Sequence, residues 1–79
     1  MKLEIQKNEK IMEVENFQDS HFQEIESNFY QEYFRSRYID RRGLYEYIDT
    51  MKNFNKTVGS YMDCDFPVMI RIYLEDKEV

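Results

Sequence analysis

Regular alternation of hydrophobic and polar residues near the N-terminus predicts two β-strands. In each segment the hydrophobic side chains fall on every second position, which is typical of a strand with one buried face. These positions are Leu3, Ile5, Met12 and Val14. We therefore expect strands over residues 2–7 and 10–15. Asn8 lies between them and tolerates left-handed backbone angles, so we expect a tight hairpin turn there.

The last hydrophobic segment alternates in the same way and predicts a third strand, over residues 68–75. Its hydrophobic positions are Val68, Ile70, Ile72 and Leu74. Met69 and Tyr73 fall on the opposite face of this strand. Pro67 precedes the strand, and proline is tolerated at the first position of a strand because its missing amide breaks no ladder bond there.

Hydrophobic residues in the middle of the chain recur every three or four positions, which is the period of an amphipathic helix. The first series is Phe22, Ile25, Phe29 and Tyr33, with an adjoining stripe of Tyr30, Phe34 and Tyr38. The second series is Leu44, Tyr47, Ile48, Met51 and Phe54. We expect helices over residues 20–37 and 41–54. Asp19 or Ser20 would cap the first helix, and Asp40 the second.

These elements predict an α+β fold in a single domain over residues 1–79. The expected order is ββααβ, a small antiparallel three-stranded sheet with two helices on one face. The last strand would lie beside the first. We expect Val58, Tyr61 and Met62 to lie in a loop after the second helix and to pack as a cover. Both sheet edges would be exposed, and exposed edges can accept a partner strand or a second copy of the chain.

Composition and charge narrow the class of partner and the compartment. The 79 residues include 42% hydrophobic and 34% charged residues, and the net charge is -5. This charge disfavours binding to nucleic acid or anionic lipid, because such binding depends on neutralising phosphates. The single cysteine, Cys64, cannot form an intramolecular disulfide, and the first residues lack the apolar segment of a signal peptide. We therefore expect a cytoplasmic protein with no membrane association.

The charge is unevenly distributed along the chain. Residues 1–34 contain three lysines and eight acidic residues, whereas residues 35–42 contain four arginines and one acidic residue. The arginines are Arg35, Arg37, Arg41 and Arg42. They could bind phosphate groups, since guanidinium is always charged and forks onto phosphate oxygens. In the alternative interpretation, the first two complement the end of the first helix and pair with Glu32, and the last two face water.

Acidic and aromatic residues form the second group of candidates for binding. Spaced carboxylates could complement a basic surface, and tyrosine and arginine are enriched among residues that dominate the energy of protein interfaces. The candidates for partner binding are Glu13, Glu15, Glu24, Glu32, Tyr30, Arg37 and Tyr38. We expect several tyrosines to be partly exposed, from among Tyr30, Tyr38, Tyr45, Tyr61 and Tyr73. The alternative is that the carboxylates only keep a small protein soluble.

No arrangement of residues indicates catalysis or metal binding. His21 has no nucleophile at motif spacing, and the carboxylates beside Cys64 raise the pKa of a thiol and so reduce its reactivity. We predict no enzyme activity, no cofactor and no metal. In size, charge and composition the chain resembles small acidic anti-restriction and anti-CRISPR inhibitors of phages and mobile elements, a resemblance of type that no motif carries.

This resemblance implies a non-enzymatic inhibitor that blocks a larger, basic, nucleic-acid-handling protein by occupying its surface. Two alternatives remain open from the sequence. One is a nucleotide- or RNA-binding module that uses the arginines of residues 35–42. The other is a structural homo-oligomer, in the simplest case a homodimer, built by pairing of strand edges or through the aromatic face of the first helix.

Overall fold

The main element of the fold is a four-stranded antiparallel sheet with strand order β2-β1-β6-β5. The computed structural model describes residues 1–32, 35–36, 38–62 and 68–74, and only the backbone of Glu32, Arg35 and Ser36. The strands are β1 (Lys2–Lys7), β2 (Lys10–Val14), β5 (Val58–Met62) and β6 (Met69–Tyr73). The predicted three-stranded sheet of order ββααβ is therefore wrong, because residues 58–62 form a strand instead of a loop.

Contact with the second helix, α2 (Arg41–Asn53), explains why the hydrophobic pattern of the sequence does not predict β5. Its inward positions are Gly59 and Tyr61, so the strand lacks the hydrophobic alternation of a half-buried strand. A Cβ atom built on Gly59 would lie 2.8 Å from both Met51 Sδ and Tyr47 Oη. Glycine therefore lets α2 lie close to the edge of the sheet, and this packing fixes a strand that local pattern does not indicate.

The N-terminal hairpin and the central strand pair match the prediction closely. Asn8 has a φ of 57°, as expected for the turn, and β2 ends one residue before its predicted limit. Asn16 has a φ of 52° and turns the chain away from the sheet. Pairing of Leu3 with Ile72 places β6 antiparallel beside β1, which confirms the expected contact between the first and last strands.

The first helix is much shorter than predicted. A 3₁₀ turn, Asp19–His21, leads into α1 (Phe22–Phe29), and Tyr30 caps the C-terminal end of α1 with a φ of -112°. The chain then forms two short paired strands, β3 (Gln31–Glu32) and β4 (Arg35–Ser36), so the prediction of a helix to residue 37 is wrong. Aromatic residues suit strands as well as helices, and burial of Tyr30 fixes the end of α1. Tyr33 and Phe34 lie outside the described residues.

The second helix matches its predicted limits to within one residue, and Asp40 caps it as expected. The Asp40 carboxylate accepts a hydrogen bond of 3.0 Å from the Gly43 amide and one of 3.1 Å from the Tyr61 hydroxyl. A Cβ atom on Gly43 would collide with both of these side-chain groups. Gly43 therefore costs some helix propensity but leaves room for the cap and for its contact with β5.

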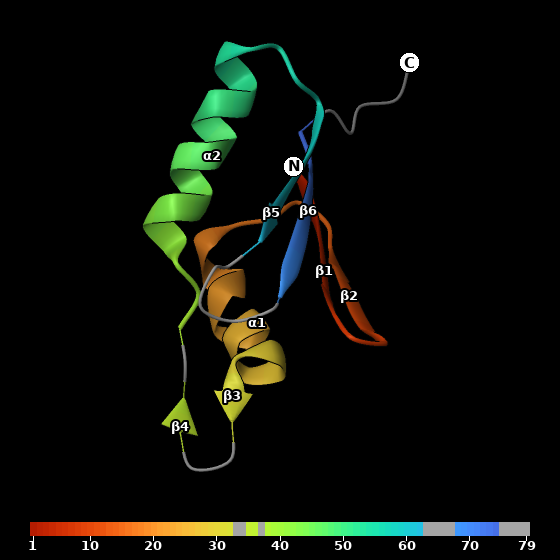
Figure 1. The fold of residues 1–79 in the computed structure, drawn as a ribbon, viewed down its shortest axis with the longest axis vertical. Coiled ribbons are helices and arrows are strands. Elements are labelled where there is room, and N and C mark those ends of the chain that lie inside the picture. Colours follow the sequence, from red (N-terminus) through yellow and green to blue (C-terminus); the bar gives the residue numbers. More distant parts are fainter. Residues whose placement is uncertain (33–34, 37, 63–67, 75–79) are drawn as a thin grey trace.

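Both helices pack on one face of the sheet, as Figure 1 shows, and together they enclose the core. β1 contributes Leu3 and Ile5, and β6 contributes Ile70 and Ile72. The remaining buried hydrophobic residues are Val14, Phe17, Phe22, Ile25, Phe29, Tyr30, Ile39, Leu44, Ile48, Met51 and Val68. Neither described helix is long and apolar enough to span a bilayer. None of the described helices lies over the opposite face of the sheet (Figure 1), and we call it the open face.

Candidate functional site

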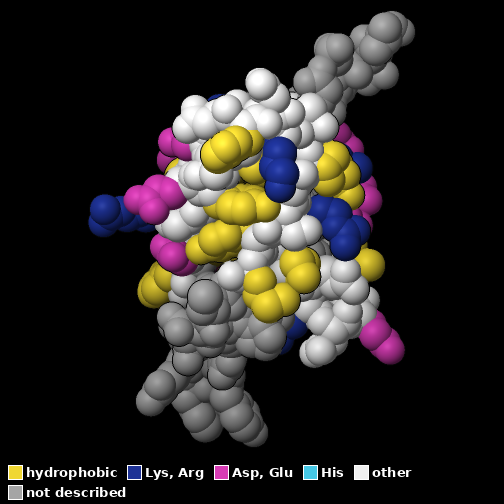
Figure 2. Space-filling model, turned by 45° about the horizontal axis from the view of Figure 1, so that its top comes forward, with side chains coloured by type: hydrophobic (Ala, Val, Ile, Leu, Met, Phe, Trp, Pro, Cys, Tyr) yellow, Lys and Arg dark blue, Asp and Glu magenta, His cyan; other side chains and the backbone are white. Residues whose placement is uncertain are grey.

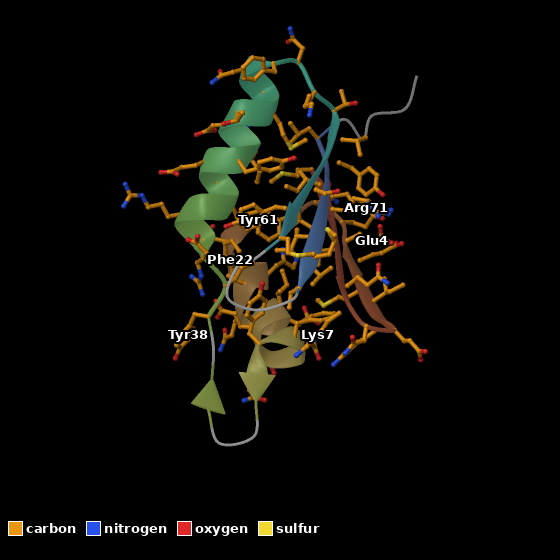
Figure 3. All side chains as sticks on the ribbon, viewed as in Figure 1. Glu4, Lys7, Phe22, Tyr38, Tyr61 and Arg71 are labelled. Carbon is orange, nitrogen blue, oxygen red and sulfur yellow. The ribbon has the colours of Figure 1, made fainter. Side chains whose placement is uncertain are left out.

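The open face presents side chains from all four strands in three rows that cross the sheet. In Figure 3, Glu4 and Arg71 lie on this face, whereas Tyr61 lies on the side of α2. Strand register aligns the rows. Each row is given in order from β2 to β5. The first row is Ile11, Gln6, Met69 and Met62, and the second row is Glu13, Glu4, Arg71 and Ser60. The third row is Lys2, Tyr73 and Val58, and Glu15 lies just beyond the end of β2.

The first and third rows expose hydrophobic side chains. Ile11 is 54% exposed, Val58 52% and Met62 51%, while Met69 and Tyr73 are half-buried. Hydrophobic side chains also reach the surface on another side of the molecule, the one that faces the viewer in Figure 2. Grouped apolar side chains of this kind mark interaction surfaces on small proteins. The open face is therefore the best candidate for a binding surface.

A network of charged side chains joins the second and third rows of the open face. Lys2 Nζ lies 3.5 Å from Glu13 and 3.8 Å from Glu15, so one lysine is shared by two carboxylates. Glu4 lies 3.6 Å from Arg71 and accepts a hydrogen bond of 3.3 Å from the Tyr73 hydroxyl. Ion pairs this exposed contribute little stability. Because Lys2 balances only one of the two carboxylates, Glu13 and Glu15, an excess of negative charge remains on the β2 side of the face.

The structure brings together only part of the predicted partner-binding set. Glu13 and Glu15 share Lys2 on the open face, whereas Glu24 lies on α1, in the helical layer on the other side of the sheet. Tyr38, just before α2, is 74% exposed, as predicted. Tyr30 is fully buried, so its predicted exposure is wrong and its side chain does not reach the surface. Arg37 and the Glu32 side chain lie outside the described part.

The two described side chains of the predicted phosphate-binding group are paired with carboxylates. Arg41 donates to both Glu26 carboxylate oxygens at 3.1–3.3 Å, and its guanidinium lies 4.6 Å from the centre of the Phe22 ring. Arg42 lies 3.2 Å from Glu46, one helical turn along α2. Arg37 and the Arg35 side chain fall outside the described residues. Arg41 thus joins α2 to α1, a contact that neither sequence interpretation predicted.

A second polar contact joins α2 to the 3₁₀ turn before α1. The Tyr45 hydroxyl donates a hydrogen bond to the Asp19 carboxylate, and the Tyr45 ring packs edge-on against Phe22. Burial, followed by the hydrogen bond to Asp19 and its negative charge, raises the pKa of Tyr45 to about 12. Tyr45 is therefore neutral near pH 7 and acts as a hydrogen-bond donor between elements.

Several residues of the open face were absent from the predicted site. Ile11, Val58 and Met62 were assigned no role in binding, although the alternation of the last strand had already placed Met69 and Tyr73 opposite the core. Recognising residues 58–62 as a strand would have extended the same face to Val58 and Met62. Within the described ranges, no group of three His, Cys, Asp or Glu side chains is placed to hold a metal ion.

Comparisons with known proteins found no matching protein family, no similar curated protein and no similar solved structure. The argument for function therefore rests on the geometry and chemistry of the open face.

Proposed function

We propose that this protein is a small non-enzymatic inhibitor that binds a larger protein and blocks it by occupying a basic surface. The proposed target handles nucleic acid, and the proposed mode of action is that of anti-CRISPR or anti-restriction proteins of phages and mobile elements. The observation that carries the proposal is the open face, where exposed apolar side chains of the first and third rows lie beside charged side chains, with the carboxylates gathered toward β2.

The composition of the open face supports protein binding. Exposed Ile11, Val58 and Met62 supply apolar area that loses water when a partner covers it, which favours association. Glu13 and Glu15 supply negative charge that speeds encounter with a basic surface and fixes its orientation. A surface that handles nucleic acid is basic because it neutralises phosphates, so it offers the complementary charge.

The proposed setting is the cytoplasm of a host cell. A single cysteine among 79 residues suits a reducing compartment, since the chain does not depend on an intramolecular disulfide for stability. The proposed target would be found in the same compartment.

Affinity capture from a lysate of the host cell tests the proposal. The immobilised wild-type protein is compared with a Glu13→Lys/Glu15→Lys variant and with a matched control, Glu24→Lys/Asp49→Lys. Both variants change the net charge equally, but the control changes lie on the helices. We expect the open-face variant to recover much less of the partner and the control to recover the wild-type amount. The recovered partner is then assayed for inhibition by the wild-type protein.

Two results would contradict the proposed function. Equal recovery of the partner by both variants would remove the open-face carboxylates from the interface. A second copy of this chain as the only species bound, with a dimeric mass by light scattering, would favour the homo-oligomer. Thermal melting of each variant shows whether a loss of capture reflects unfolding.

A further inference from the structure

The two edges of the sheet differ in a way that the sequence does not indicate. At the β5 edge, the Ser60 amide donates a hydrogen bond of 3.2 Å to the Tyr47 hydroxyl of α2. Helix α2 thus occupies the centre of this edge, where an incoming strand would need that amide. Covering an edge with a helix is a common protection against unwanted strand pairing.

The β2 edge is open. The two-residue turn after Lys7 makes Lys7 and Lys10 the hydrogen-bonded pair that closes the hairpin. Because such pairs alternate along antiparallel strands, the amides and carbonyls of Ile11 and Glu13 point away from β1. None of the described residues accepts a hydrogen bond from these two amides. Figure 1 shows β2 on the outside of the sheet, with none of the described helices or strands beyond it.

We propose that the β2 edge binds an extended segment of the partner as a fifth strand, and that alternate residues of this segment are lysine or arginine. This inference rests on the proposed function and names the part of the partner that the site receives. Backbone hydrogen bonds to Ile11 and Glu13 supply the pairing. Glu13 and Glu15 select basic side chains on the open face.

Charge favours a basic partner strand over a second copy of this chain. In the two-fold arrangement that pairs Ile11 of one copy with Glu13 of the other, Glu9 of each copy faces Glu15 of its neighbour. Like charges placed directly opposite one another in a sheet are destabilising. Each chain also carries a net charge of -5, so self-pairing is opposed at long range as well. A strand with alternating lysines replaces this repulsion with attraction.

Two synthetic peptides of equal charge test the proposal. The first is a capped eight-residue peptide of alternating lysine and valine, and the second is the same peptide with every backbone amide N-methylated. Only the first can donate backbone hydrogen bonds to β2, since N-methylation removes the amide donors of the second. We expect the unmethylated peptide to bind at least about tenfold more tightly, because each backbone bond adds to affinity. It should also slow hydrogen exchange at Ile11 and Glu13 but not at Val58.

A pair of substitutions at one position separates backbone pairing from charge. Glu13→Gln removes only the charge, whereas Glu13→Pro also removes the outward amide and leaves the bonds between β1 and β2 intact. We expect the proline variant to bind the unmethylated peptide about tenfold more weakly than the glutamine variant. If the proline variant does not fold, the unmethylated and N-methylated peptides are compared on the glutamine variant instead, and the methylated peptide should show the same loss.

The outcomes distinguish this inference from the proposed function. Equal binding of the two peptides, protection at Val58 instead of Ile11, or equally tight binding by the proline and glutamine variants would each overturn strand addition at β2. A partner that is captured through Glu13 and Glu15 but binds Glu13→Pro as well as it binds Glu13→Gln leaves the proposed function standing and contradicts pairing at the β2 edge. If the wild-type protein captures no partner at all, the proposed function fails, and the peptides still decide whether β2 accepts a basic strand.

Discussion

Replacing Glu26 with alanine should destabilise the protein more than any other single change to a carboxylate on α1. The Glu26 side chain is only 11% exposed, and it accepts hydrogen bonds from Arg41 and from the Ile39 amide at 3.3 Å. It therefore joins α1 to the segment that starts α2. Glu24 lies on the same helix, is exposed, and its carboxylate has no described partner. Glu24→Ala is the matched control.

The magnitude follows from the groups left behind. A part-buried amide without an acceptor costs about 1–3 kcal/mol. Loss of a charge-assisted bond to Arg41 adds about 1.5 kcal/mol, at the low end of its range because Arg41 is half exposed and regains water. These contributions overlap, so we expect a loss of about 2–3 kcal/mol. For a domain of this size the melting temperature should fall by about 10–20 °C.

Urea unfolding followed by circular dichroism measures the effect, with Glu24→Ala expected to change the free energy of unfolding by less than about 0.5 kcal/mol. A double-mutant cycle with Arg41→Ala should give a coupling energy of about 1 kcal/mol between the two side chains. If Glu26→Ala is no more destabilising than Glu24→Ala, or if the coupling energy is zero, the contacts of Glu26 with Arg41 and the Ile39 amide do not stabilise the fold in the way described.

Three further changes test other contacts. Because the pKa of Tyr45 is raised to about 12, its neutral form stabilises the fold fully below pH 10, and this contribution is lost as the pH rises toward 12. Urea unfolding should therefore show a steeper loss of stability between pH 10 and 12 for the wild type than for Tyr45→Phe, and parallel profiles would contradict this. Gly59→Val should lower the free energy of unfolding by about 1–3 kcal/mol, because the valine side chain would meet Met51 and Tyr47. Ser60→Val, on the open face, should leave the stability unchanged, and thermal melting of both variants measures the difference. Asp40→Ala should cost about 1–2 kcal/mol through loss of the helix cap, with Asp40→Asn closer to the wild type, and equal melting temperatures for both variants would refute the capping role.

The sequence determined those elements whose signal is local. Alternation marked the N-terminal hairpin and the last strand, and the left-handed tolerance of Asn8 placed the turn. The helical period and the carboxylate of Asp40 located α2 to within one residue. In each case a short segment carries both its pattern and its boundary signal, so neighbouring residues suffice.

Only the tertiary structure decided the remaining elements, because their signals depend on residues far away in the chain. Helix α1 ends where Tyr30 enters the core, although the helical spacing of aromatic residues continues beyond it. Strand β5 exists because Gly59 lets α2 lie against it. Pairing across the sheet separated Glu13 and Glu15 from Glu24. Tyr47 covers the β5 edge, which leaves β2 as the open edge. The separation of the carboxylates and the difference between the two edges both depend on which strands and helices meet in space.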